Sequence, residues 1–185
     1  MNATVAPPRT TVIRLVWLAC LLAVSGLLGY AYYAQYQLYL DPCPLCITQR
    51  AFYVGIGAGA LLGLLGARRL ALRRVAAVLV VLSAIGGIVT AGRQVWLQHL
   101  PKDQVPECGP GLQYWLENMP LLETLSLLFR GDGNCAEVQW TFLGLSMGEW
   151  SLTWFIAFLV IGLAMLMYAF VARRTAVTGV AAHAH

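Results

Sequence analysis

Four long stretches of apolar residues dominate the chain, and shorter polar segments separate them. The uncharged runs cover residues 15–33, 51–67, 75–92 and 152–172. A helix needs about 20 apolar residues to cross the hydrocarbon core of a bilayer. We therefore predict four membrane-spanning helices, at about 13–33, 47–67, 75–93 and 152–172.

The composition excludes several classes of protein. Of the 185 residues, 59% are hydrophobic and 11% are charged, whereas soluble domains carry about 25% charged residues. These values do not fit an ordinary soluble domain, a disordered chain or a nucleic-acid-binding protein, and the polar remainder is too short to cover four buried core helices. The predicted fold class is all-α, an integral membrane four-helix bundle that forms a single domain over residues 1–185.

The first apolar run could instead be a cleaved signal peptide, whose apolar region spans about 7–15 residues. Here the run is longer and ends in Tyr30, Ala31, Tyr32 and Tyr33. Such aromatic residues are typical of a membrane interface, so we expect a retained span. Cys20 lies inside it and is expected to be a small core residue.

The charges predict the orientation in the membrane. Eight of the twelve basic residues flank the spans at three places where no acidic residue occurs: Arg9, Arg14, Arg68, Arg69, Arg73, Arg74, Arg173 and Arg174. Basic residues stay in the cytoplasm. Both termini and the loop 68–74 are therefore expected to be cytoplasmic, and the loops at about 34–46 and 94–151 periplasmic.

The long outer loop contains two segments with apolar faces. Pro120 is expected to open a short helix to Phe129, because leucines recur there at helical spacing. Residues 130–134 (Arg-Gly-Asp-Gly-Asn) predict a turn. Between residues 137 and 150, tryptophan, phenylalanine and leucine alternate with polar residues. That composition favours a second short helix, which lies in the membrane interface or packs against the bundle.

Four of the five cysteines are expected in the periplasmic loops, where disulfides persist: Cys43, Cys46, Cys108 and Cys135. By spacing alone they allow three pairings. Cys43-Pro44-Leu45-Cys46 lies where the second span begins, and a C-x-x-C pair at a helix N-terminus favours a reactive thiolate.

Arg50 falls on the same helical face as Cys43 and Cys46, about 6 Å along the axis beyond Cys46. An arginine at membrane depth indicates function, and its charge would favour a thiolate at Cys46. The alternative is an arginine that reaches up to the membrane surface. Gln94, at the outer end of the third span, could donate a hydrogen bond to a ligand carbonyl, although simple capping at the interface explains it as well.

Other cysteine chemistries fit less well. Ile47 rather than histidine follows the motif, which excludes covalent haem attachment. A zinc site would need a tighter repeat than the 27-residue spacing of Cys108 and Cys135, so no metal is expected. A framework of purely structural disulfides remains an alternative.

The chain closely resembles the bacterial disulfide bond formation protein family DsbB. The resemblance rests on residues 43–50 (Cys-Pro-Leu-Cys-Ile-Thr-Gln-Arg), on the second cysteine pair, and on the segments 92–101 and 139–147. The resemblance covers nearly the whole chain. It implies an inner-membrane thiol:quinone oxidoreductase that reoxidises a periplasmic DsbA-type thioredoxin-fold oxidase and passes the electrons to ubiquinone or menaquinone.

The resemblance also implies a role for each site residue. The disulfides are expected to be Cys43–Cys46 and Cys108–Cys135, and the partner attacks the second pair and forms a mixed disulfide with Cys108. Cys135 then exchanges with the first pair. Cys46 forms an adduct or charge-transfer pair with the quinone ring, and Arg50 stabilises the negative charge.

Two alternatives remain open. One is an enzyme like vitamin K epoxide reductase, although in that family the C-x-x-C lies near the last span. The other is a non-enzymatic membrane subunit held by structural disulfides.

Overall fold

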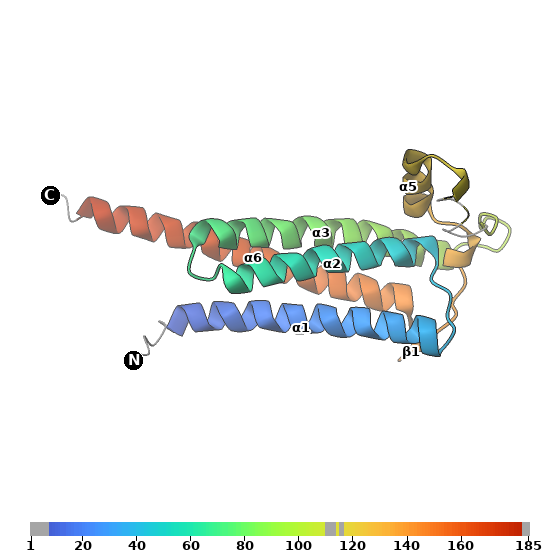
Figure 1. The fold of residues 1–185 in the computed structure, drawn as a ribbon, viewed down its shortest axis with the longest axis horizontal. Helices are drawn as coiled ribbons and strands as arrows, with labels where there is room; N and C mark the ends of the chain where they lie inside the picture. Colours follow the sequence, from blue (N-terminus) through green and yellow to red (C-terminus); the bar gives the residue numbers. More distant parts are fainter. Residues whose placement is uncertain (1–7, 110–113, 115–116, 183–185) are drawn as a thin grey trace.

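Four long helices lie side by side along one axis in the computed structural model, which describes residues 8–109, 114 and 117–182 (Figure 1). They are α1 (Pro8–Gln37), α2 (Pro44–Leu65), α3 (Leu70–Gln98) and α6 (Met147–Ala182). Each has the length and apolar composition of a membrane span. The predicted all-α membrane bundle is therefore confirmed.

The helices extend beyond most of the predicted span limits, because polar residues continue a helix once it has left the apolar layer. α3 runs on to Gln98 and is capped by His99, two residues before Pro101, which cannot continue a helix. α2 is the exception at its far end. It stops at Leu65 with Gly66 as its cap, whereas we predicted the span to reach residue 67.

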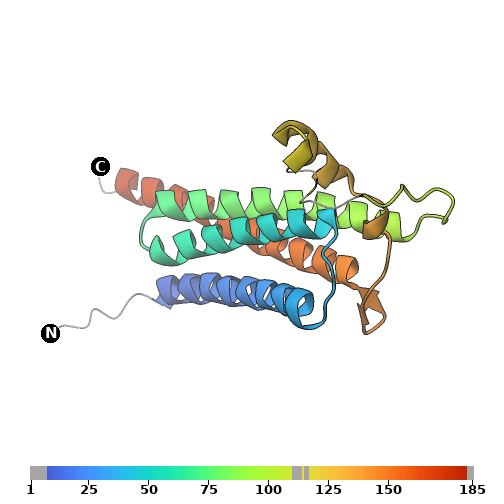
Figure 2. The same cartoon turned by 45° about the vertical axis from the view of Figure 1, so that its right-hand side comes forward.

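The start of α1, the end of α6 and the turn between α2 and α3 lie at one end of the bundle, and the short elements of the outer loop lie at the other (Figures 1 and 2). The arginine-rich segments therefore share one end. All four cysteines of the predicted loops belong to the opposite end, so the fold separates these arginine-rich segments from the cysteines.

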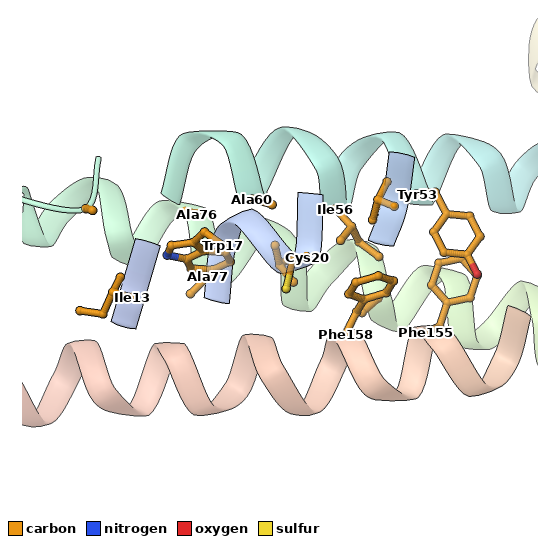
Figure 3. Packing of buried hydrophobic residues seen from close by; sticks show 14 of the residues in the cluster. Ile13, Trp17, Cys20, Tyr53, Ile56, Ala60, Ala76, Ala77, Phe155 and Phe158 are labelled. Carbon is orange, nitrogen blue, oxygen red and sulfur yellow. The ribbon is translucent and has the colours of Figure 1, made fainter. Parts of the chain in front are cut away.

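Small residues allow the helices to approach closely. A Cβ on Gly59 would lie 2.7 Å from Val80 of α3, and one on Gly63 would overlap the Trp17 ring of α1, with Cδ2 of that ring only 2.6 Å away. Trp17 is fully buried beside Ala60, and farther along the bundle the Tyr53 ring stacks on Phe155 of α6 at 4.3 Å (Figure 3). Close packing of this kind holds spans together in a lipid environment.

The outer surface of the bundle is apolar. Leu22 of α1, Leu65 of α2, Val89 of α3 and Val160 of α6 are each at least 60% exposed. Side chains of this kind on every long helix suit contact with lipid chains, which are as apolar as leucine.

The outer loop confirms one predicted helix and corrects the other. α5 (Leu121–Arg130) begins directly after Pro120 and ends at Gly131, as the leucine spacing predicts. Residues 137–150 do not form the expected second helix. They contain the antiparallel hairpin of β1 (Thr141–Phe142) and β2 (Leu145–Ser146), and α6 follows at once. A 3₁₀ turn, η1 (Gly133–Cys135), lies between α5 and the hairpin.

Candidate functional site

The Cys43–Cys46 pair forms the N-terminus of α2. Cys43 is the N-cap residue, and its sulfur accepts a hydrogen bond from the backbone N–H of Cys46 at 3.3 Å. Pro44 occupies the first turn, where its missing N–H costs nothing. The thiol of Cys43 donates to Cys46 Sγ at 2.8 Å. The neighbouring thiol thus directs a hydrogen-bond donor at Cys46, and the positive end of the helix dipole also favours a thiolate in the first turn.

Cys135 lies against Cys43 in a buried cluster formed with Leu45 and Leu97. Cys135 is fully buried. Hydrogen bonding with Cys135, then hydrogen bonding with Cys46 and burial, raises the pKa of Cys43 above that of an ordinary thiol. The geometry therefore brings one cysteine of the long outer loop into contact with the pair at the mouth of α2.

Cys108 lies on the exposed side of the same region. Its loop contacts η1, because Gly133 N–H donates to the carbonyl oxygen of Glu107 at 3.1 Å, and a Cβ on Gly133 would lie 3.0 Å from Cys108 Sγ. Cys108 is thus held near the turn that carries Cys135 and remains exposed to solvent. All five cysteines are free thiols in this structure, so the pairings Cys43–Cys46 and Cys108–Cys135 stay predictions.

Gln94 of α3 contacts Cys46 directly. It is 4% exposed, and its Nε2 donates to Cys46 Sγ at 3.4 Å. Its Oε1 accepts a hydrogen bond from Gln49 Nε2 at 2.7 Å. Simple capping at the interface therefore does not describe Gln94. Gln49 is a site residue that the sequence analysis missed, although it lies between the cysteine motif and Arg50.

Arg50 points from α2 toward α1. It donates to Gln35 Oε1 and to the carbonyl oxygen of Ala31, the latter at 3.1 Å. Its guanidinium also lies over the Tyr32 ring, 4.9 Å from the centroid. Three contacts to one helix fix the orientation of this cation beside the cysteine pair.

Cys46, Arg50 and Gln94 share the wall of a cavity of about 300 Å³. That volume lies at the lower end of the range for small-molecule sites, about 300–1,000 Å³. The remaining lining is mostly aromatic and apolar and comes from α1, α2, the hairpin and α6: Leu27, Tyr30, Ala31, Gln49, Tyr53, Trp140, Phe142, Met147, Trp150, Ser151 and Trp154. A flat ring with polar substituents fits such a lining, with the polar groups directed at Cys46, Arg50 and Gln94.

The hairpin, which stands where a helix was predicted within residues 137–150, forms part of this cavity. Trp140 and Phe142 stack at 6.0 Å, Trp150 Nε1 donates to the Phe142 carbonyl oxygen at 3.0 Å, and Tyr30 of α1 contacts Trp140 at 5.6 Å. The hairpin thus closes one side of the cavity with aromatic rings.

Cys20 is outside the site. It is 3% exposed and packs in the main hydrophobic core with Trp17 and Ile56, as predicted for a small core residue. Across the residues that the structure describes, no group of three histidine, cysteine, aspartate or glutamate side chains is arranged to hold a metal ion.

Comparisons with known proteins agree with the motifs. The family model described as "Disulfide bond formation protein DsbB" matches residues 13–165. The chain is 48% identical over 145 residues to disulfide bond formation protein B of Hahella chejuensis, covering 78% of this chain and 88% of the relative. Disulfide bond formation protein B of Marinobacter nauticus is 44% identical, over 83% of this chain and 89% of the relative. Disulfide bond formation protein B 1 of Pseudomonas aeruginosa is 43% identical, over 79% of this chain and 90% of the relative.

Proposed function

This chain belongs to the DsbB family of disulfide bond formation proteins, and on that premise we propose that it is a membrane thiol:quinone oxidoreductase. In this proposal it reoxidises a DsbA-type dithiol oxidase of the periplasm by disulfide exchange and delivers the electrons to the membrane quinone pool. Its four spanning helices and its family support a multi-pass protein of the bacterial inner membrane.

One observation carries the proposal. Cys43 and Cys46 have adjoining sulfurs that face different partners, because Cys43 lies against Cys135 while Cys46 lines the aromatic cavity. A disulfide between them would connect the thiols of the outer loop to whatever occupies the cavity. A purely structural disulfide needs no such neighbours.

In the proposed cycle, each exchange step breaks one S–S bond and forms another. A partner thiolate attacks the Cys108–Cys135 disulfide at the exposed Cys108, and Cys135 leaves with the electron pair and takes up a proton. Cys135 then attacks Cys43, so that a Cys135–Cys43 bond forms, the Cys43–Cys46 bond breaks and Cys46 is released as a thiolate. The second partner thiol displaces Cys108 and forms the partner's disulfide. Cys108 then attacks Cys135, so that the Cys108–Cys135 bond re-forms, the Cys135–Cys43 bond breaks and Cys43 is released as a thiol beside Cys46. Reoxidation of this dithiol to the Cys43–Cys46 disulfide restores the starting state. Each cycle oxidises one dithiol and yields two electrons and two protons.

A quinone, when bound, would supply the two-electron oxidant, and it is soluble in the lipid from which the cavity must be reached. Arg50 and Gln94 would direct their N–H groups at its oxygens or at Cys46, and the aromatic side chains would hold its ring and exclude water. Such an acceptor is needed because a DsbA-type disulfide is itself strongly oxidising, at about −120 mV.

The activity is tested with the purified protein, a reduced DsbA-type partner and a soluble ubiquinone analogue, whose absorbance is followed. We expect one quinone consumed per partner disulfide formed, and no turnover after Cys46→Ser. Cys20→Ala is the matched control, because Cys20 lies in the core away from the site. Turnover that survives Cys46→Ser would overturn the proposal.

For the orientation, we propose that the cysteine end of the bundle faces the periplasm and the arginine-rich end the cytoplasm, in accordance with the positive-inside rule. A membrane-impermeant maleimide should label Cys108 in reduced cells whose outer membrane alone has been permeabilised. Labelling that requires lysis of the inner membrane would contradict this orientation.

A further inference from the structure

Asp132 is a buried carboxylate between the two segments that carry Cys108 and Cys135. It is 6% exposed and precedes η1. Its Oδ2 accepts hydrogen bonds from Gly109 N–H and from Asn134 Nδ2, each at 3.1 Å, and its Oδ1 accepts one from Asn134 N–H, also at 3.1 Å. A buried polar group is costly unless it is hydrogen-bonded, and these three donors fix the position of the carboxylate.

The fourth partner of this carboxylate is a reactive sulfur. The Cys135 thiol donates to Asp132 Oδ1 at 3.7 Å. Cys135 also lies against Cys43. One sulfur therefore contacts both a proton-accepting oxygen and the sulfur that it must attack.

We propose that Asp132 is the general base for the exchange between the two cysteine pairs, an inference that rests on the function proposed above. In this step the proton of Cys135 moves to Asp132 Oδ1 as the sulfur attacks Cys43. The Cys135–Cys43 bond forms, the Cys43–Cys46 bond breaks, Cys135 is oxidised and Cys46 is reduced to a thiolate. No other oxidant or reductant takes part.

A base is needed here because the thiolate, not the thiol, is the nucleophile. A free thiol has a pKa of about 8.5, so only a small fraction is ionised at neutral pH. A positioned general base contributes about 10²–10⁴-fold to a rate. The bond from Gly109 also ties the Cys108 segment to the same carboxylate, which keeps the two outer cysteines close to each other.

Other titratable or charged groups surround this turn, and their titration must be separated from that of Asp132. Cys43 and Cys46 come from the start of α2, and Glu107 and Cys108 come from the loop after α3. Arg93 of α3 reaches the same region, where its Nε donates to the Arg130 carbonyl oxygen at 3.3 Å.

The test measures the exchange step alone. In the full-length Cys108→Ser variant, Cys135 stays a free thiol beside a Cys43–Cys46 disulfide formed with the quinone analogue. After a jump from pH 4 to values between 6 and 9, samples are quenched with acid, and freed Cys46 is labelled and quantified by peptide mass spectrometry. We expect the rate to change little with pH when Asp132 is present.

Adding Asp132→Asn should slow exchange at pH 6.5 by about 100-fold, which lies within the range for a general base. The rate should then rise roughly tenfold per pH unit and approach that of the parent near pH 9, because hydroxide replaces the lost base below the thiol pKa. Glu107→Gln is the control for charge, since it removes the same charge from an exposed side chain nearby. It should leave both rate and pH profile unchanged.

Asn134→Ala tests whether Asp132 acts as a base or only holds the loop together. The variant removes the side-chain hydrogen bond from Asn134 to Asp132 but leaves the carboxylate in place. It should keep the flat pH profile. A uniform slowing by Asp132→Asn at every pH, or the same steep profile in Asn134→Ala, would overturn the proposal. A failure of the proposed function would give a different result from a failure of this inference, because the unaltered protein would then not reduce quinone in the presence of its reduced partner.

Discussion

The side-chain amide of Gln94 donates a hydrogen bond to the sulfur of Cys46, with Nε2 and Sγ 3.4 Å apart. Gln49 fixes the orientation of that amide, because its own Nε2 donates to Gln94 Oε1 and so leaves only the NH₂ group to face the sulfur. Two neutral side chains from neighbouring helices thus direct a donor at the thiol next to the cavity.

Gln94→Leu should slow the alkylation of Cys46 in the reduced protein. A hydrogen bond to a charged group contributes about 1.5–3 kcal/mol, so the rate at neutral pH should fall by about tenfold or more. Gln94→Glu should have a larger effect, since a carboxylate offers no donor and repels a thiolate. Timed labelling with iodoacetamide and peptide mass spectrometry measures both. Equal rates in the parent and both variants would show that Gln94 does not stabilise the thiolate.

The sequence predicted the cysteines and Arg50 because their types and spacing indicate chemistry on their own. Gln49 carries no such signal. Its role depends on Gln94, 45 residues away on a different helix, and pairing between helices is not visible in the pattern of a single one. Asp132 was likewise seen only as part of a turn, since its neighbours Gly109 and Cys135 meet it through the fold of the loop.

Arg50→Ala should weaken quinone use while exchange between the cysteine pairs continues. The half-saturating concentration of the quinone analogue should rise about tenfold or more, in line with the loss of charge-assisted hydrogen bonds. Arg50→Lys keeps the charge but cannot donate to both Gln35 and Ala31 as the guanidinium does, so it should rescue only part of the loss. Steady-state kinetics at varied quinone concentration give the half-saturating concentration for the parent and for both variants. Unchanged quinone kinetics in Arg50→Ala would mean that Arg50 is only an interfacial anchor.

Gly63→Ala should destabilise the bundle, because the new Cβ would overlap the fully buried Trp17 ring, with Cδ2 of that ring only 2.6 Å away. Overpacking of this kind costs about 1–3 kcal/mol. Gly26→Ala is the matched control in a spanning helix, since a Cβ there meets nothing within 4 Å. Thermal unfolding in detergent should show a lower midpoint for Gly63→Ala alone. Equal midpoints for the two variants would contradict the close contact of α1 and α2.

The bundle itself was predictable, since four apolar runs of spanning length leave the chain few other arrangements. The hairpin after residue 140 was not, because its two-residue turn places Leu143 and Gly144 at φ values of 53° and 81°. Such turns usually contain Asn-Gly or Asp-Gly, and leucine gives no sign of a left-handed backbone. Alternating aromatic and polar residues over so short a segment fit a strand or a helix equally well.

The reduced protein should lose stability above pH 9 through Cys43. Contact with Cys135 and Cys46, together with burial, raises the pKa of Cys43 above its ordinary value of 9.0. In the unfolded chain this thiol ionises near its ordinary pKa, so above that pH the unfolded state releases a proton that the folded state retains. The stabilisation is complete below about pH 9 and falls as pH rises toward the folded pKa, by at most about 1.4 kcal/mol per pH unit.

Thermal unfolding of the reduced protein between pH 7 and 10.5 measures the effect, and Cys43→Ser should remove this part of the decline. The same slope above pH 9 in the parent and in Cys43→Ser would mean that Cys43 ionises equally in both states.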